Sequence, residues 1–274
     1  MKDLAQRRPV LSFLALAYVG SWLGWSPWWL SESGVGVLPF RLPFEGIALV
    51  NQAGLFAGPF AAALVMTRVL EGPGRPRAFL ARAFSFRGRR AAYLGALLAV
   101  PLVVATPYLV LADGTPEGLR ASMLATTLAT YLTYLAGGPI QEEPGWRGFA
   151  LPRMQRSMHP LAAAVGLGVV HTFWHAPLFL TQEWDTARSD VGQFAAYVLL
   201  IVALSIVLSW VFNTSEGSSV PAILAHNSLN WGLLLAGNML GAPVENTWPA
   251  ALTMAALAGV ILGLTRGRLA YDTP

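Results

Sequence analysis

The sequence predicts an all-α, polytopic transmembrane helix bundle of about eight spans, with the N-terminus and the C-terminus in the cytoplasm. Hydrophobic residues make up 55% of the 274 residues and charged residues only 12%, whereas a soluble domain carries about 25% charged residues. The apolar residues gather into stretches of about 20 residues, the length of a helix that crosses the hydrocarbon core. The cations lie almost entirely in alternate connecting segments.

The expected spans, in chain order, are 10–30, 46–70, 91–111, 121–140, 160–180, 191–212, 219–239 and 248–265. The first span follows Arg7 and Arg8 and has no clear small-x-small cleavage site, so we expect it to be retained. Its late part carries tryptophans that predict an interfacial aromatic belt, namely Trp22, Trp25, Trp28 and Trp29. Strands are excluded because open sheet edges cannot be satisfied in lipid.

Small residues in the first two spans predict close helix packing, since Gly20 pairs with Gly24 and Gly54 with Gly58 at small-xxx-small spacing. The segment 71–90, rich in arginine, is the linker-like loop before the third span. We expect one integral membrane domain, 1–274, with a motif-bearing catalytic core at 121–239.

The positive-inside rule orients the bundle. With the N-terminus inside, the inner segments hold fifteen of the eighteen cations, and the exceptions are Arg41, Arg120 and Arg188. The formal charge of +4 therefore indicates contact with lipid headgroups, and no nucleic-acid partner is expected. The absence of cysteine excludes thiolate catalysis and disulfides. The predicted location is a bacterial plasma membrane.

Ionisable groups inside a bilayer cost about 2.5–3.5 kcal/mol each, so they are candidates for function. The first cluster is Gln141-Glu142-Glu143-Pro144-Gly145-Trp146-Arg147, at the inner end of the fourth span. Arg147 follows Glu143 by four residues and can hold one carboxylate ionised. The other carboxylate, desolvated beside a like charge, can serve as a general base. The alternative interpretation is a cluster of charges at the membrane interface.

Two further clusters share the i, i+4 spacing that places side chains on one helix face. His171 and His175 lie in the fifth span, and the spacing also suits two metal ligands. His226 and Asn230 lie in the seventh span and can donate two hydrogen bonds to an oxyanion. Interhelical hydrogen bonding is the structural alternative for each pair.

Together the clusters resemble the CPBP family, which comprises CAAX prenyl endopeptidases and bacteriocin-processing or immunity proteins, also called Abi. The resemblance rests on Glu142-Glu143-x-x-x-Arg147, on Trp174-His175-x-Pro-Leu-Phe, and on His226 with Asn230. It covers about 137–231, and the first three spans resemble the family only in being hydrophobic.

The resemblance implies an intramembrane endopeptidase of the glutamate type that cleaves a membrane-associated peptide or protein. Glu142 would activate a water with His175, and His226 with Asn230 would stabilise the oxyanion. Glu143 and Arg147 would support the site. One departure is His171, which stands where the family usually has an aromatic residue. It is either a tolerated planar substitution or an extra polar group in the site.

We expect no cofactor, because no His-Glu-x-x-His stretch is present. Zinc is the alternative. In a metal-dependent mechanism the ligands would be Glu142, His175 and His226, and His171 extends that set.

The expected depths of the two motifs conflict. His175 lies about 15 residues from the inner end of its span, or roughly 22 Å, whereas Glu142 is expected at the interface. Either the Glu-Glu segment re-enters at Gly137-Gly138-Pro139, or the fifth span begins later than expected.

A second function remains open from the sequence. The same motifs can serve as packing elements in a non-enzymatic membrane immunity or scaffold protein that binds other membrane proteins. A transporter is disfavoured because no internal repeat is present.

Overall fold

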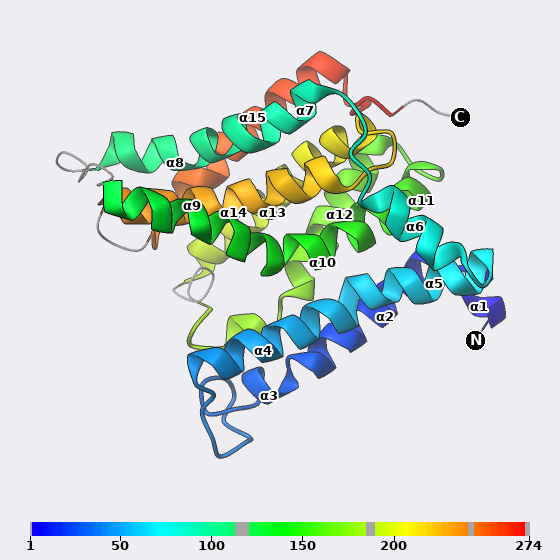
Figure 1. Ribbon diagram of the computed structural model, residues 1–274, viewed down its shortest axis with the longest axis horizontal. Helices are drawn as coiled ribbons and strands as arrows, with labels where there is room; N and C mark the ends of the chain where they lie inside the picture. The colour runs from blue at the N-terminus through cyan, green and yellow to red at the C-terminus, as the bar shows by residue number, and fades with distance from the viewer. Residues whose placement is uncertain (1, 113–120, 185–189, 241–243, 272–274) are drawn as a thin grey trace.

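The computed structural model describes residues 2–112, 121–184, 190–240 and 244–271, and every regular element in these ranges is a helix (Figure 1). The all-α prediction is thus confirmed. The helices are α1 (Lys2–Arg7), α2 (Pro9–Gly24), α3 (Ser26–Trp29), α4 (Phe44–Leu55), η1 (Phe56–Phe60), α5 (Ala61–Glu71), α6 (Arg75–Ala83), α7 (Arg90–Leu94), η2 (Gly95–Ala99), α8 (Val100–Leu111), α9 (Ala121–Ala136), α10 (Pro139–Glu143), η3 (Pro144–Ala150), α11 (Leu151–Gln155), α12 (Pro160–Trp174), η4 (Leu178–Leu180), α13 (Val191–Asn213), α14 (Val220–Leu240) and α15 (Trp248–Thr265).

The N-terminal part of the bundle is the pair formed by α2 and the continuous segment α4–η1–α5. A Cβ atom on Gly20 would lie 2.0 Å from the Ala57 carbonyl oxygen, and one on Gly24 would lie 2.6 Å from the Gly54 Cα. Only glycine allows these backbones to lie so close, so the predicted close packing of the first two spans is confirmed.

The rest of the bundle packs around α13 and α14. Helix α13 contacts α12 on one side and α15 on the other, and α14 contacts α8 and α9. In Figure 1, α7 and α15 lie along one side of the bundle, α2 with α4 and α5 along the other, and α9, α13 and α14 between them. The polar clusters of the sequence lie on the helices in the middle.

Within the described ranges, four helical segments are long and apolar enough to cross a membrane: Phe44–Glu71, Arg90–Leu111, Val191–Asn213 and Trp248–Thr265. Two shorter apolar helices, Pro9–Gly24 and Pro160–Trp174, accompany them. Helix α14 has the length but carries a histidine and three asparagines, which lower its hydropathy. The count of about eight spans therefore stays a prediction, while the apolar helices identify an integral membrane protein.

Two of the expected spans, 121–140 and 160–180, contain helices that end earlier, at Ala136 and Trp174, and this difference removes the conflict in depth. Helix α9 ends at Ala136, but the chain continues helically from Pro139 to Gln155. The low hydropathy of the Glu-Glu segment had indicated an interface, yet Glu142 is only 4% exposed because its partners are buried with it. Helix α12 ends at Trp174, since Pro177 disfavours helical backbone before it.

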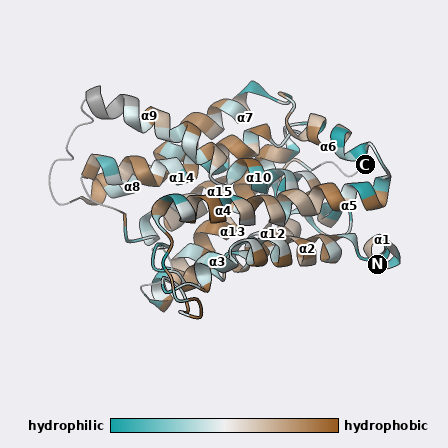
Figure 2. Cartoon of the chain, turned by 60° about the horizontal axis from the view of Figure 1, so that its bottom comes forward, coloured by the Kyte–Doolittle hydropathy of each residue, from teal (hydrophilic) through white to brown (hydrophobic). Residues whose placement is uncertain are grey.

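The two ends of the bundle differ in charge, and hydrophilic residues of one of these ends lie near α5 and α6 in Figure 2. Four connecting segments form the arginine-rich end: 72–90, 152–159, 214–219 and 266–271. Hydrogen bonds join several of them, since the Ser219 N–H donates to the Ala83 carbonyl (2.8 Å) and Asn213 Nδ2 donates to the Leu269 carbonyl (2.8 Å). At the opposite end, the Gln182 N–H donates to the Ser33 carbonyl (2.8 Å). Helix α1 and the end of α15 both lie toward the arginine-rich end (Figure 1).

Candidate active site

The Glu-Glu motif is held in the middle of the bundle by glycines. Pro139 starts α10 after the break at Gly137-Gly138, because proline suits the first turn of a helix. A Cβ atom on Gly145 would lie 2.5 Å from the Pro59 carbonyl oxygen of η1. Glycine at this position lets η3 lie directly on η1, which fixes the depth of both carboxylates.

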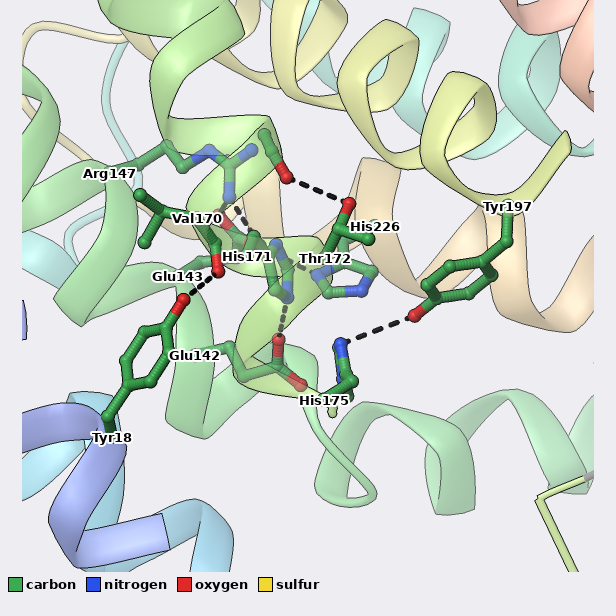
Figure 3. A network of polar contacts seen from close by, with 11 residues as sticks. Tyr18, Glu142, Glu143, Arg147, Val170, His171, Thr172, His175, Tyr197 and His226 are labelled. Carbon is green, nitrogen blue, oxygen red and sulfur yellow. Dashed lines mark hydrogen bonds and ion pairs between the residues drawn. The ribbon is translucent and has the colours of Figure 1, made fainter. Parts of the chain in front are cut away.

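Glu143 joins Arg147 and His226 in a buried network (Figure 3). Arg147 Nη1 lies 3.1 Å from Glu143 Oε2, and His226 Nδ1 lies 2.7 Å from Glu143 Oε1. Glu143 and Arg147 are both fully buried, so each charge depends on the other. A carboxylate at Nδ1 fixes that nitrogen as the proton donor. Nε2 of His226 is thereby left for a group in the cavity.

Glu142 faces a different histidine. His171 Nε2 lies 2.7 Å from Glu142 Oε2, and both side chains are buried. His171 Nδ1 has no hydrogen-bond partner among the described residues. A neutral ring that donates from Nε2 explains both facts, since Nδ1 then carries no hydrogen that needs an acceptor.

His175 completes the group without bonding directly to Glu142. Its ring stacks on His171 with centroids 5.2 Å apart, and the Tyr197 hydroxyl lies 3.2 Å from its Nδ1. One ligand atom each from Glu142, His171 and His175 lies within 4.8 Å of the others. A water molecule with two hydrogen bonds of ordinary length spans such a gap.

These groups open onto a cavity of about 710 Å³. Every predicted catalytic residue lines it, namely Glu142, His175, His226 and Asn230, together with His171. Glu143 and Arg147 are not part of the lining and lie behind its wall. The structure therefore brings all the predicted site residues together. Some line the cavity, and Glu143 and Arg147 lie directly behind these.

The remaining lining is mostly apolar or aromatic, and it includes a second carboxylate, Glu183. Burial raises the pKa of the Glu183 carboxyl, but hydrogen bonds from Trp28 and Ser33 outweigh it and hold the pKa below its usual value. The residues that line the cavity, within the described ranges, include no lysine or arginine.

Comparison with known proteins bears on the same region. The family model described as "Type II CAAX prenyl endopeptidase Rce1-like" matches residues 124–232. The chain is also similar to a protein named CAAX prenyl protease 2 from Methanococcus maripaludis, with 25% identity over 92 residues. That match spans 32% of this chain and 34% of the relative. Both matches support the CPBP family for the motif-bearing region. Because this relative is archaeal, a bacterial plasma membrane stays a prediction.

Sequence reasoning missed two residues that line the cavity, Trp25 and Tyr197. Trp25 was expected in an interfacial belt but is fully buried, and its ring faces His175 at 6.3 Å between centroids. Its Nε1 donates to the Asn51 carbonyl (3.2 Å), so burial leaves no unpaired donor there. Tyr197 was also missed, because a single tyrosine in an apolar span carries no signal of its own.

The donor atoms of the site fit a divalent ion such as zinc. Two imidazoles and one carboxylate are the ligand types and number of a catalytic zinc site. The group that lies close enough is Glu142, His171 and His175. The expected alternative set was Glu142, His175 and His226, extended by His171. His226 is not in the group that lies close enough, and its Nδ1 faces Glu143. A bound ion would lower the pKa of a water in this position.

Proposed function

We propose that this chain is an intramembrane endopeptidase that hydrolyses a peptide bond of a membrane-associated substrate with a water activated by Glu142. The observation that carries the proposal is the convergence of Glu142, His175, His226 and Asn230 on one cavity. These residues come from three segments that are separated by apolar sequence. Packing alone would not require their polar atoms to share a space.

The reaction begins with a water held between Glu142 and His175. Glu142 takes one proton as the water oxygen bonds to the carbonyl carbon of the substrate. The carbonyl electron pair moves to its oxygen, and His226 Nε2 and the Asn230 amide donate hydrogen bonds to that oxyanion. When the oxyanion collapses, the C–N bond breaks and the proton on Glu142 passes to the leaving amine.

Glu143 acts through His226 in this scheme. Its carboxylate holds Nδ1 at 2.7 Å, so the ring donates from Nε2 only when it carries both protons. The negative charge of Glu143 balances the positive charge of that form. Arg147 lies on the other side of Glu143 at 3.1 Å and fixes the carboxylate in place.

The charge of the lining favours cleavage inside a chain. A substrate bound by its C-terminal carboxylate would need a cation in the cavity, as in most carboxylate-recognition sites. The described lining instead carries Glu142 and Glu183. An internal segment without a free carboxylate meets no such repulsion.

Glu142→Gln tests the proposal. The amide keeps the shape of the side chain but cannot take a proton, so cleavage should fall at least about a hundredfold. Membrane and secreted proteins from cells that express the wild type or the variant are compared by quantitative mass spectrometry. An unprocessed peptide should accumulate in the variant.

Glu143→Gln is the matched control, because it removes the neighbouring carboxylate. It leaves Arg147 buried without its anion, a loss of about 3–5 kcal/mol, and should lower the melting temperature in detergent while Glu142→Gln does not. Full processing by a folded Glu142→Gln variant would refute the enzyme assignment and favour the immunity or scaffold function.

A further inference from the structure

The cavity lies toward one end of the bundle. Its walls include Trp25 near the end of α2, Asn238 near the end of α14, and the connecting residues Glu183 and Val244. All of these belong to the end opposite the arginine-rich end. No residue from 72–90, 152–159, 214–219 or 266–271, the described connections of the arginine-rich end, lines the cavity.

Large buried side chains fill the space between the arginine-rich end and the cavity. Trp146, Phe149 and Leu151 follow the Glu-Glu motif in that direction, and all three are fully buried. Phe13 packs on Trp146 at 5.5 Å and on Phe149 at 5.0 Å between ring centroids. Interiors packed in this way leave no channel for water or peptide.

Charge identifies which side each end faces. The exposed arginines of the arginine-rich end are Arg7, Arg8, Arg68, Arg75, Arg77, Arg82, Arg87, Arg89, Arg90, Arg156, Arg266 and Arg268. At the opposite end, the described connecting segments and helix ends carry one cation, Arg41, and five carboxylates, Glu32, Glu45, Glu183, Asp190 and Glu245. The positive-inside rule places the arginine-rich end in the cytoplasm.

We propose that the cavity is entered from the non-cytoplasmic side of the membrane and that the substrate is a peptide segment presented on that side. This inference rests on the proposed function and names the substrate class of the same site. An exported protein, or the outer part of a membrane protein, supplies such a segment. A cytoplasmic C-terminus does not reach Glu142, because Trp146 and Phe149 lie in the way.

The experiment uses the absence of cysteine from the natural chain. Single variants Asn238→Cys, Glu45→Cys and Arg156→Cys place one thiol in the cavity, one on the opposite end and one on the arginine-rich end. Glu45 and Arg156 are both exposed. Each variant is treated with a membrane-impermeant trimethylammonium methanethiosulfonate, first in spheroplasts and then in inside-out vesicles.

The thiols at 238 and 45 should react in spheroplasts at least tenfold faster than in inside-out vesicles, and the thiol at 156 should show the reverse preference. Reaction of the cavity thiol from the same side as the thiol at 156 would overturn the proposal. So would reaction of the cavity thiol from neither side, or an inverted pattern for the two surface controls.

The labelling does not depend on catalysis, which separates the two proposals. Asn238→Cys combined with Glu142→Gln should be labelled as fast as Asn238→Cys alone. If labelling comes from the cytoplasmic side while Glu142→Gln still blocks processing, the enzyme assignment stands and only the side of entry is wrong. If labelling is as expected but processing does not depend on Glu142, the proposed function is wrong. The substrate class is then wrong as well, and only the inferred side of entry to the cavity is supported.

Discussion

At the scale of single residues, His171 is the feature that distinguishes this site from the pattern of the CPBP resemblance. The position usually holds an aromatic residue, and the sequence left open whether histidine is a planar substitute or an added polar group. Its Nε2 lies 2.7 Å from Glu142 Oε2, while its ring keeps an aromatic contact with Trp146 at 5.4 Å. The geometry supports the second interpretation, in which His171 is a positioning residue for Glu142.

His171→Phe and His171→Gln separate the two interpretations. Phenylalanine keeps the ring and removes the donor, so Glu142 loses a hydrogen bond to a charged group, about 1.5–3 kcal/mol or roughly ten- to a hundredfold in kcat. Glutamine keeps an N–H donor and should recover part of that loss. Steady-state kinetics on a substrate identified by the proteomic comparison would measure kcat and KM separately.

If His171 had only a structural role, both variants would lose stability, and KM would change together with kcat. Equal kcat for wild type and His171→Phe would identify His171 as a planar substitute. The melting temperature of each variant in detergent provides the control for folding.

At the scale of elements, the site depends on backbones that approach closely at glycines. The α10–η3–α11 segment carries both carboxylates, and its depth is set where Gly145 lies against η1. At η1 itself the chain is kinked, since Gly58 has ψ −119° and Pro59 lacks an N–H donor. Helix α12 approaches α13 in a similar way, because a Cβ atom on Gly168 would lie 2.8 Å from the Val202 Cα.

Gly145→Ala should therefore destabilise the protein although alanine favours helices. The added methyl group meets a backbone carbonyl oxygen at 2.5 Å, and backbone atoms cannot move aside as a flexible side chain can. Overpacking of this kind costs about 1–3 kcal/mol. Thermal unfolding in detergent should report a lower melting temperature.

Gly259→Ala is the matched control for this prediction. Gly259 lies within α15, and a Cβ atom there meets no atom within 4 Å. Its melting temperature should equal or exceed that of the wild type. Equal melting temperatures for the wild type and Gly145→Ala would contradict the close contact between η3 and η1.

At the scale of the whole molecule, apolar residues predominate along the helices, and hydrophilic residues gather near α1, α6 and the end of α5 (Figure 2). Large side chains such as Leu49 (72% exposed), Leu102 (64%) and Leu264 (82%) face outward. Exposed apolar surface of this extent would aggregate in water and is stable in contact with lipid. The polar residues of the site, in contrast to these exposed apolar side chains, are buried and paired inside the bundle.

Reporter fusions at the C-terminus test the orientation of the whole chain. A green fluorescent protein fused after the last residue should fluoresce, and an alkaline phosphatase at the same position should be inactive, because the positive-inside bias keeps this end in the cytoplasm. Whole-cell fluorescence and phosphatase activity are the measurements. An active phosphatase fusion would contradict the predicted orientation and, with it, the proposed side of entry.

The sequence by itself determined the fold class and the polar residues that were expected to gather in one candidate site. Composition required lipid around the chain, and helices follow because their backbone groups are satisfied within one segment. The i, i+4 spacing of His226 with Asn230 placed both side chains on one face of α14, where both line the cavity. Such relations are local and depend only on helix geometry.

Only the tertiary structure decided the pairings and the depth of the site. Glu142 pairs with His171 across 29 residues and Glu143 pairs with His226 across 83 residues. Two adjacent carboxylates look alike in the sequence. The packing of α10 against α14 and η1 assigns Glu142 to the cavity, where it meets His171 of α12, and assigns Glu143 to Arg147 and His226. The same packing buried the Glu-Glu segment, because charges that satisfy one another no longer need water.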